Sequence, residues 1–65
     1  MEYTKNLKEI RKKLGITQAE MADVLGYKSK AGYSELERGN VKVTLEQAKK
    51  ISEVFNLSIN DIFFN

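Results

Sequence analysis

A chain of 65 residues predicts one small domain, and such a domain buries only about 60% of the surface that its unfolded form exposes. The sequence has no cysteine and no histidine, which excludes disulfides, thiol and imidazole nucleophiles, and the usual zinc sites. Stability must therefore come from helix packing and oligomerisation, and we expect no metal, cofactor or small-molecule ligand. The net charge is only +2, but the basic residues gather in segments 1–15 and 27–43. Such segregation favours a nucleic-acid partner only weakly.

The hydropathy pattern carries no targeting or membrane signal. No apolar run is longer than three residues, and the first fifteen residues hold none that resembles a signal peptide. We therefore expect a cytoplasmic protein that makes no contact with a membrane.

Glycines, in a chain without proline, divide the sequence into predicted helices. The first helix covers about residues 5–14, and Gly15 follows it at the position of a C-terminal cap. Its apolar residues recur at helical spacing, at Leu7, Ile10 and Leu14. The second helix follows the capping box Thr17-Gln-Ala-Glu20 and ends at Gly26.

The third predicted helix covers about residues 30–38, with Ser29 as its N-cap and Gly39 as its left-handed stop. Its apolar stripe consists only of Tyr33 and Leu36. Most of this helix must therefore face water or a charged partner. Gly32 inside the helix costs about 1 kcal/mol relative to alanine, which indicates that something approaches the backbone closely.

The fourth predicted helix opens with a second capping box, Thr44-Leu-Glu-Gln47, and ends near Asn56. Its apolar residues are expected to face inward: Leu45, Ala48, Ile51 and Phe55. The fifth helix covers about residues 58–64, with Leu57 and Ile62 spaced as a hydrophobic staple. Five short helices with brief connections predict a compact all-α domain over residues 1–65.

The second and third helices, at about residues 17–38, are typical of a helix-turn-helix, because a short helix ending in glycine leads tightly into a helix with one apolar stripe. The sequence here resembles the Cro and lambda-repressor type of helix-turn-helix protein, also called the XRE family. The matching segments are Gly15-Ile-Thr-Gln-Ala-Glu-Met-Ala-Asp-Val-Leu-Gly26, Tyr33-Ser-Glu-Leu-Glu-Arg-Gly39, Thr44-Leu-Glu-Gln-Ala48 and Phe55-Asn-Leu-Ser58. The resemblance covers about residues 5–63. It implies a five-helix, lambda-repressor-like regulator that binds operator DNA as a homodimer, most simply as a repressor.

One departure from the family pattern concerns the register of the third helix. In the family, apolar core positions fall six and nine residues after the turn glycine, where this chain has Gly32 and Glu35. Glycine fills no space, and a carboxylate buried without a partner is unfavourable. A shift by one residue places Tyr33 and Leu36 there instead. We therefore predict a turn one residue longer than usual, within residues 26–29.

With this register, the resemblance places four residues of the third helix in the major groove: Lys30, Ala31, Gly32 and Glu35. Lys30 can donate to guanine O6 and N7, Ala31 can meet a thymine methyl group, and Glu35 can accept from cytosine N4. Gly32 would let the backbone come close. The alternative is that these residues form a solvated face, with Gly32 as a weak point.

The resemblance also implies phosphate contacts. Gln18 matches a phosphate-binding position in the first turn of the second helix, where free N–H groups and the helix dipole suit an anion. Further candidates lie beside Gln18 or bracket the third helix: Thr17, Lys28, Ser29, Arg38, Asn40 and Lys42. Arg11 and Glu37 match the family's ion pair between the first and third helices. The alternative is that these are ordinary solvated side chains and two unrelated surface charges.

Other function classes find less support in the residues. Without histidine, cysteine or a Gly-rich phosphate loop, we expect no enzyme. A protein-interaction module with the same fold, such as an antitoxin that binds a toxin, is the main alternative. RNA binding needs exposed aromatic platforms, for which Tyr3 and Tyr27 are the obvious candidates.

The C-terminal helix supplies a candidate dimer interface. A single helix-turn-helix covers few base pairs, and related proteins bind as two-fold dimers with recognition helices roughly 34 Å apart. If the helix continues, Phe64 points about 100° away from Phe63 and therefore lies outside the core. We expect Phe64, helped by Leu57 or Ile62, to form a self-complementary seam.

Overall fold

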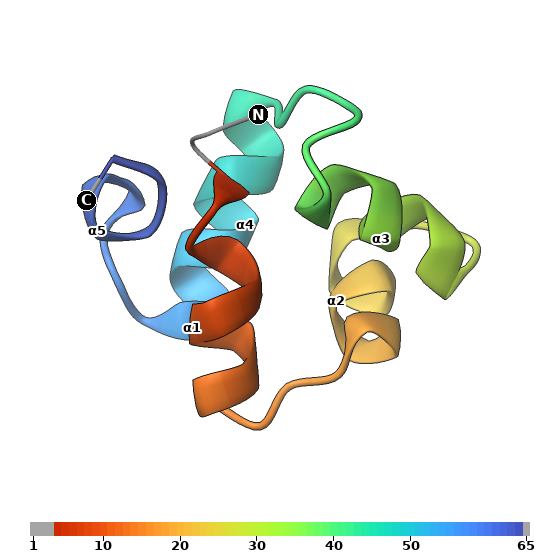
Figure 1. Ribbon diagram of the computed structural model, residues 1–65, viewed down its shortest axis with the longest axis horizontal. Coiled ribbons are helices and arrows are strands. Elements are labelled where there is room, and N and C mark those ends of the chain that lie inside the picture. The colour runs from red at the N-terminus through yellow and green to blue at the C-terminus, as the bar shows by residue number, and fades with distance from the viewer. Residues whose placement is uncertain (1–3, 65) are drawn as a thin grey trace.

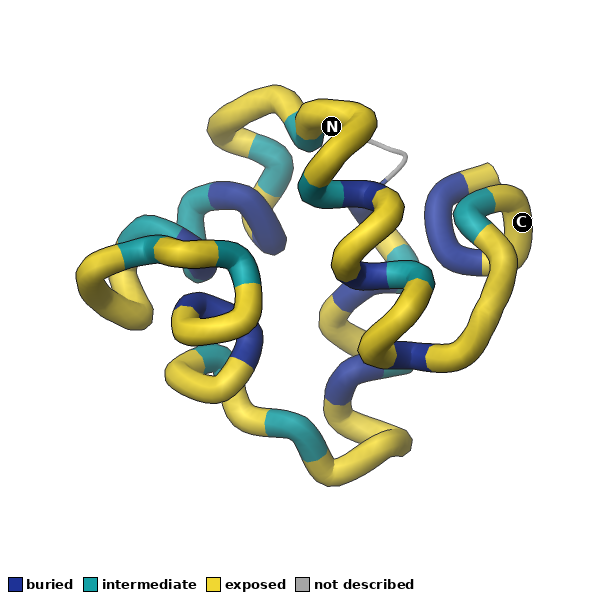
Figure 2. Tube along the Cα trace, turned by 180° about the vertical axis from the view of Figure 1, so that it is seen from behind, coloured by how far each residue is buried: buried dark blue, intermediate teal, exposed yellow. Residues whose placement is uncertain are grey.

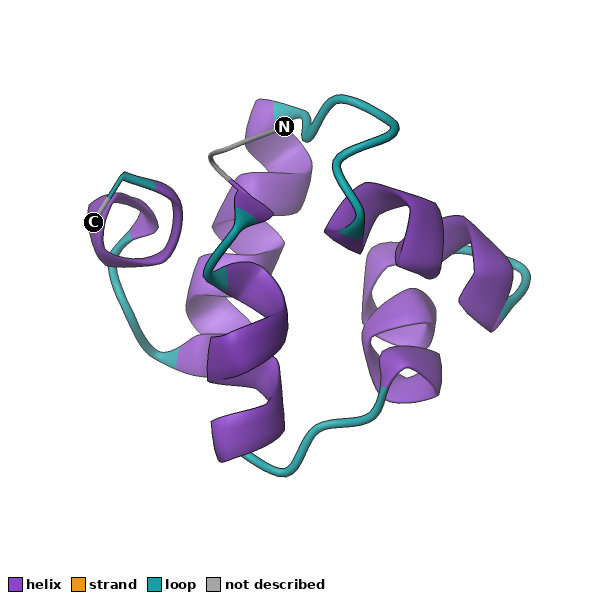
Figure 3. Cartoon of the chain, in the orientation of Figure 1, coloured by secondary structure: helices purple, strands orange, loops and turns teal. Residues whose placement is uncertain are grey.

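The computed structural model describes residues 4–64, which form five helices joined by short connections. The helices are α1 (Leu7–Lys13), α2 (Gln18–Leu25), α3 (Lys30–Glu37), α4 (Leu45–Phe55) and α5 (Ile59–Phe63). In Figure 1, α2 and α3 lie together on one side, α5 lies on the opposite side, and α1 and α4 lie between them. Figure 3 shows only helices and loops over residues 4–64, so the predicted all-α fold class is confirmed. No helix in this range is long and apolar enough to cross a membrane.

The core lies where the five helices meet, and every helix contributes to it. Figure 2 shows buried segments on the inward sides of the helices. Among residues 4–64, the buried apolar side chains are Leu7, Met21, Ala22, Tyr33, Leu36, Ala48, Ile51, Phe55, Ile62 and Phe63. Helices of five to eleven residues are marginal alone in water, so each depends on this shared core.

The helix N-termini are capped largely as the sequence predicts. The hydroxyl of Thr17 accepts from the Glu20 N–H at 3.0 Å, and that of Thr44 accepts from the Gln47 N–H at 3.1 Å. The reciprocal bonds of both capping boxes are also present. Ser29 has the extended backbone of an N-cap, but its side chain makes no capping bond to α3. Ser29 is therefore the N-cap that the sequence predicts, through its backbone alone.

Two leucines expected to face the core are exposed. α1 ends at Lys13, one residue earlier than predicted, so Leu14 is the C-cap and is 50% exposed. The residue after it, Gly15, has a φ of 73° and turns the chain at this point, so the Leu14 side chain lies outside the core. Leu45 is 74% exposed because it is the first residue of α4, ahead of the turns that pack on the core. Helical periodicity predicts that both side chains face the core, and this is wrong because each residue lies at a helix end.

Tyr27 holds the connection between α2 and α3. Its backbone N–H donates to the Ala22 carbonyl at 2.8 Å, and its hydroxyl accepts from Gln47 Nε2 at 3.0 Å. Its ring packs against the core, so Tyr27 is not the exposed platform that RNA binding would need. A Cβ atom on Gly32 would lie 2.7 Å from Cδ1 of this ring, closer than real carbon atoms approach. Gly32 therefore makes room for the Tyr27 ring, which accounts for a glycine inside α3, while its contact with DNA stays a prediction.

Replacing Gly32 with alanine should destabilise the protein by about 1–2 kcal/mol, because displacing the Tyr27 ring outweighs the roughly 1 kcal/mol gained in helix propensity. In a Tyr27→Ala background the clash is gone, so the same substitution should be stabilising. Urea denaturation of the four proteins in this cycle measures the coupling. Equal effects of Gly32→Ala in both backgrounds would show that the ring does not constrain this position.

Candidate nucleic-acid interface

α2, the connection after it and α3 form the helix-turn-helix, and the connection sets the register of α3. Gly26 ends α2 in the left-handed conformation, with a φ of 80°, and α3 begins at Lys30. Tyr33 and Leu36 are both 0% exposed, whereas Glu35 is only partly buried. The structure therefore has the shifted register that the sequence predicts.

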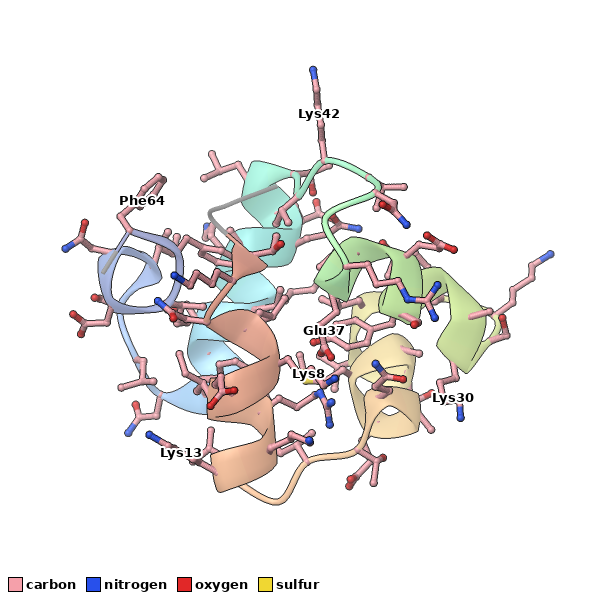
Figure 4. The ribbon with its side chains drawn as sticks, in the orientation of Figure 1. Lys8, Lys13, Lys30, Glu37, Lys42 and Phe64 are labelled. Carbon is pink, nitrogen blue, oxygen red and sulfur yellow. The ribbon has the colours of Figure 1, made fainter. Side chains whose placement is uncertain are left out.

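The outer surface of α3 begins with Lys30 and Ala31, which are both exposed. Figure 4 shows the Lys30 side chain at the start of α3, beside α2. In helix-turn-helix proteins, residues near the N-terminus of the second helix contact base edges. Lys30 and Ala31 are therefore accessible at the position where the base contacts are expected. Gly32 has no side chain and could offer DNA only its backbone, and the ring of Tyr27 lies beside it.

Glu35 is the candidate base reader whose side chain already has partners. Its Oε2 accepts from Asn40 Nδ2 at 2.6 Å, and its Oε1 lies 3.9 Å from Arg38 Nη1. The backbone N–H of Asn40 also donates to the Glu35 carbonyl at 3.0 Å. Three predicted DNA-contact residues thus meet at the end of α3. To accept from a cytosine amino group, Glu35 must use Oε1 or give up its bond to Asn40.

The other candidate phosphate contacts lie on both sides of α3. Lys28 and Ser29 precede the helix and Lys42 follows it, and all three are exposed. In Figure 4, Lys42 projects at the top of the view from the connection after α3, well separated from Lys30. The hydroxyl of Thr17 is engaged in its capping box, so a phosphate there would meet a hydroxyl that already accepts a bond.

Arg11 and Glu37 form the buried centre of the site. Arg11 Nε donates to Glu37 Oε2 at 2.8 Å, and Nη2 donates to Oε1 at 3.1 Å. Arg11 Nη1 also donates to the Ile16 carbonyl at 2.7 Å, and Gln18 Nε2 donates to Glu37 Oε1 at 3.1 Å. The two charged side chains are only 8% and 3% exposed. One carboxylate therefore joins α1, the start of α2 and the end of α3, as its position in Figure 4 shows.

Hydrogen bonding decides the charge state of this pair. Burial opposes ionisation of Glu37, but hydrogen bonds, first of all from Arg11, outweigh it and hold the pKa of Glu37 below its usual value. The bond to Glu37 in turn raises the pKa of Arg11, so both groups are charged at neutral pH. The Tyr33 hydroxyl is buried nearby and has no hydrogen-bond partner within the described residues. Burial, together with the Glu37 carboxylate, raises the pKa of Tyr33 far above its usual value.

The sequence reasoning missed the bond between Tyr27 and Gln47, which fixes the start of α3 to α4. One signal was available, because Gly32 inside a helix indicates a close neighbour. The sequence predicts DNA as that neighbour, which stays a prediction, and the ring of Tyr27 lies beside Gly32 in the structure. The second role of Gln18, as a donor to Glu37, had no sequence signal, since the two residues are 19 positions apart.

Comparisons with known proteins agree with this geometry. The family model described as helix-turn-helix matches residues 7–62. Two HTH-type transcriptional regulators of Archaeoglobus fulgidus are 40% and 39% identical over 57 residues, covering 88% of this chain and 79% and 80% of their own. An HTH-type transcriptional regulatory protein of Pyrococcus abyssi is 40% identical over 52 residues, which are 80% of this chain but 16% of that protein. No solved structure matches at a comparable level.

The family match covers most of the chain, and both Archaeoglobus fulgidus relatives are named HTH-type transcriptional regulators. The chain therefore belongs to the helix-turn-helix family of DNA-binding transcriptional regulators. This confirms the family that the sequence resembles.

Replacing Glu37 with glutamine leaves Arg11 buried without its counter-charge and should cost about 3 kcal/mol at pH 7. The pKa of Glu37 is lower in the folded than in the unfolded protein, so the unfolded state takes up the proton first as the pH falls. The ion pair's contribution is therefore complete above about pH 5 and is lost progressively below about pH 4.3, the usual pKa of glutamate. Urea denaturation between pH 3 and 7 should show a steeper loss in wild type than in Glu37→Gln, whereas parallel curves would refute this.

Proposed function

We propose that this protein is a sequence-specific regulator that binds an inverted-repeat operator in double-stranded DNA as a homodimer and represses transcription by occupying it. The accessible first turn of α3, with Lys30 and Ala31 exposed, is the observation that carries the proposal. The exposed cations Lys28 and Lys42 on either side support it, since phosphate contacts position such a helix on the duplex. The match to DNA-binding regulators over residues 7–62 supports it independently.

The proposed dimer seam is centred on Phe64. Phe64 is 70% exposed and Leu45 is 74% exposed, and both line an apolar groove of about 390 Å³ formed by the start of α4 and by α5. Ile62 is 0% exposed, so its expected place on the seam is wrong, because its helical position turns it into the core. Leu57 lies before α5 and does not line the groove. Leu45 therefore takes the place that we expected for Ile62 or Leu57.

The shape of this surface fits a second copy of the chain. A protruding ring beside its own apolar groove is self-complementary, because a two-fold axis places each Phe64 near the groove of the partner. Two adjoining exposed apolar side chains are also more than the scattered single ones usual on a monomer. The contact is small, so we expect dimerisation in the micromolar range.

Selection from random duplexes at low salt should enrich an inverted pair of half-sites about one helical turn apart. The logarithm of the affinity should fall linearly with the logarithm of the salt concentration, because binding releases counterions from the DNA. Glu35→Gln should change the preferred base at one position of each half-site, at a cost of about 1–3 kcal/mol on the wild-type operator. Recovery of no inverted motif from the wild-type selection would overturn the proposed function.

Lys42→Gln is the control for this experiment. Lys42 is exposed and lies outside α3, so its loss should weaken all duplexes alike and leave the selected motif unchanged. If Glu35→Gln also keeps the wild-type motif, Glu35 does not contact a base and only binds the side chains of Asn40 and Arg38.

Phe64→Ala should raise the dimer dissociation constant at least tenfold, because it removes the exposed aromatic ring at the centre of the seam. Sedimentation equilibrium at tens of micromolar, without DNA, measures this. Leu57→Ala is the matched control, since Leu57 is also partly exposed, at 38%, but does not line the groove. A wild type that is monomeric at these concentrations, or a Phe64→Ala variant that dimerises equally well, would rule out this seam.

The same groove favours a second candidate function, a protein-binding module such as an antitoxin. An apolar groove of about 390 Å³ can seat a side chain of another protein as well as that of a second copy. In that case the wild type would be monomeric, and Phe64→Ala would leave the affinity for duplex DNA unchanged. The sedimentation experiment and a duplex titration of the same variant therefore separate the two functions.

A further inference from the structure

A second concave surface, of about 830 Å³, lies between α1 and the start of α2. Its lining includes four basic residues, Lys8, Arg11, Lys12 and Lys30, together with the first turn of α2, and no acidic residue. We call it the α1–α2 groove. Neither Lys8 nor Lys12 has a role in the helix-turn-helix described above, although both lie beside it.

The positive charge of the α1–α2 groove is not cancelled. Glu37 compensates only Arg11, through the two hydrogen bonds of their ion pair. Lys8, Lys12 and Lys30 are exposed, and among the described residues no ion pair engages them. The groove therefore carries about three positive charges that face solvent.

The opposite side of α1 has a different balance. There a groove of about 560 Å³ is lined by two lysines, Lys5 and Lys13, and by two carboxylates, Glu9 and Asp61. Its charges sum to zero. Figure 4 shows Lys8 on the side of α1 toward α2 and α3, and Lys13 on the other side. The lysines of α1 thus contribute net charge to only one face of the molecule.

The start of α2 adds to the attraction for an anion. The N–H groups in the first turn of a helix have no partner within the helix, and its dipole is positive at that end. The capping box engages the N–H of Glu20, while Gln18 and Ala19 line the α1–α2 groove. Gln18 is itself held by its bond to Glu37, so this wall of the groove is fixed before a ligand arrives.

We propose that the α1–α2 groove binds the sugar-phosphate backbone of the operator beside the bases that α3 reads, with Lys8 and Lys12 of α1 as additional phosphate contacts. This rests on the proposed function. Lys30 lines the groove and also begins α3, so a DNA strand that passes the first turn of α3 continues toward α1. The groove is open and its charges are spread over two helices, which suits an extended polyanion. An enclosed pocket would be needed to hold one small anion.

The test compares two double variants with equal net charge, Lys8→Gln/Lys12→Gln and Lys5→Gln/Lys13→Gln. Each removes two exposed lysines from one of the two grooves that flank α1, and Lys5 lies just before that helix. Titration of the selected operator at several salt concentrations gives the slope of log affinity against log salt. The first variant should reduce the slope by about 2, or about 1 for each lost phosphate contact, and the second should leave it near wild type. Equal slopes for the two variants would overturn the proposal.

A change in the DNA checks the same contact from the other side. Uncharged methylphosphonate linkages placed one at a time along the operator should include positions where wild type loses affinity and Lys8→Gln/Lys12→Gln does not. The absence of any such position would also refute the contact. Wild type that binds no duplex at all would instead refute the proposed function, so the two failures are distinguishable. Thermal unfolding of both variants confirms that their folds are intact.

Discussion

The buried pair of Arg11 and Glu37 is the constraint on which the rest of the structure depends. A domain of 65 residues has about 3–10 kcal/mol of stability, so it tolerates two buried charges only if each has several partners. Arg11 finds them in Glu37 and the Ile16 carbonyl, and Glu37 finds them in Arg11 and Gln18. Because Glu37 is the last residue of α3, the pair holds α3 by its C-terminal end and leaves its first turn exposed.

The same pair connects the recognition helix to the surface that would meet phosphate. Gln18 donates one N–H of its amide to Glu37 and has a second, while its position in the first turn of α2 suits an anion. A phosphate bound at Gln18 would therefore join the hydrogen-bond network that fixes the end of α3. In the proposed complex, a contact that carries no sequence information still sets the orientation of the helix that reads sequence.

The sequence predicts those parts of the fold that depend on local chemistry. The capping boxes at Thr17 and Thr44 follow from short-range hydrogen bonding, and the register of α3 follows because Glu35 cannot be buried without a partner. Side-chain contacts across the fold cannot be predicted in this way, since no local sequence pattern places the Tyr27 ring beside Gly32. The prediction that Leu45 faces the core is also wrong, because a periodic pattern does not say where the first packed turn of a helix begins. The site residues follow from the family resemblance, and their DNA contacts are predictions.

In the proposed dimer, α4 would connect the seam to the recognition helix. Leu45 lies on the apolar groove, and two residues further along the same helix Gln47 donates to the hydroxyl of Tyr27. Tyr27 packs on the core and precedes Lys30, where α3 begins, by three residues. A two-fold contact at the groove would therefore fix the distance between the two copies of α3 through packed side chains, without a flexible linker. In the proposed dimer the spacing of the half-sites would follow from the rigidity of one small core, and a substitution at Tyr27 would disturb that spacing.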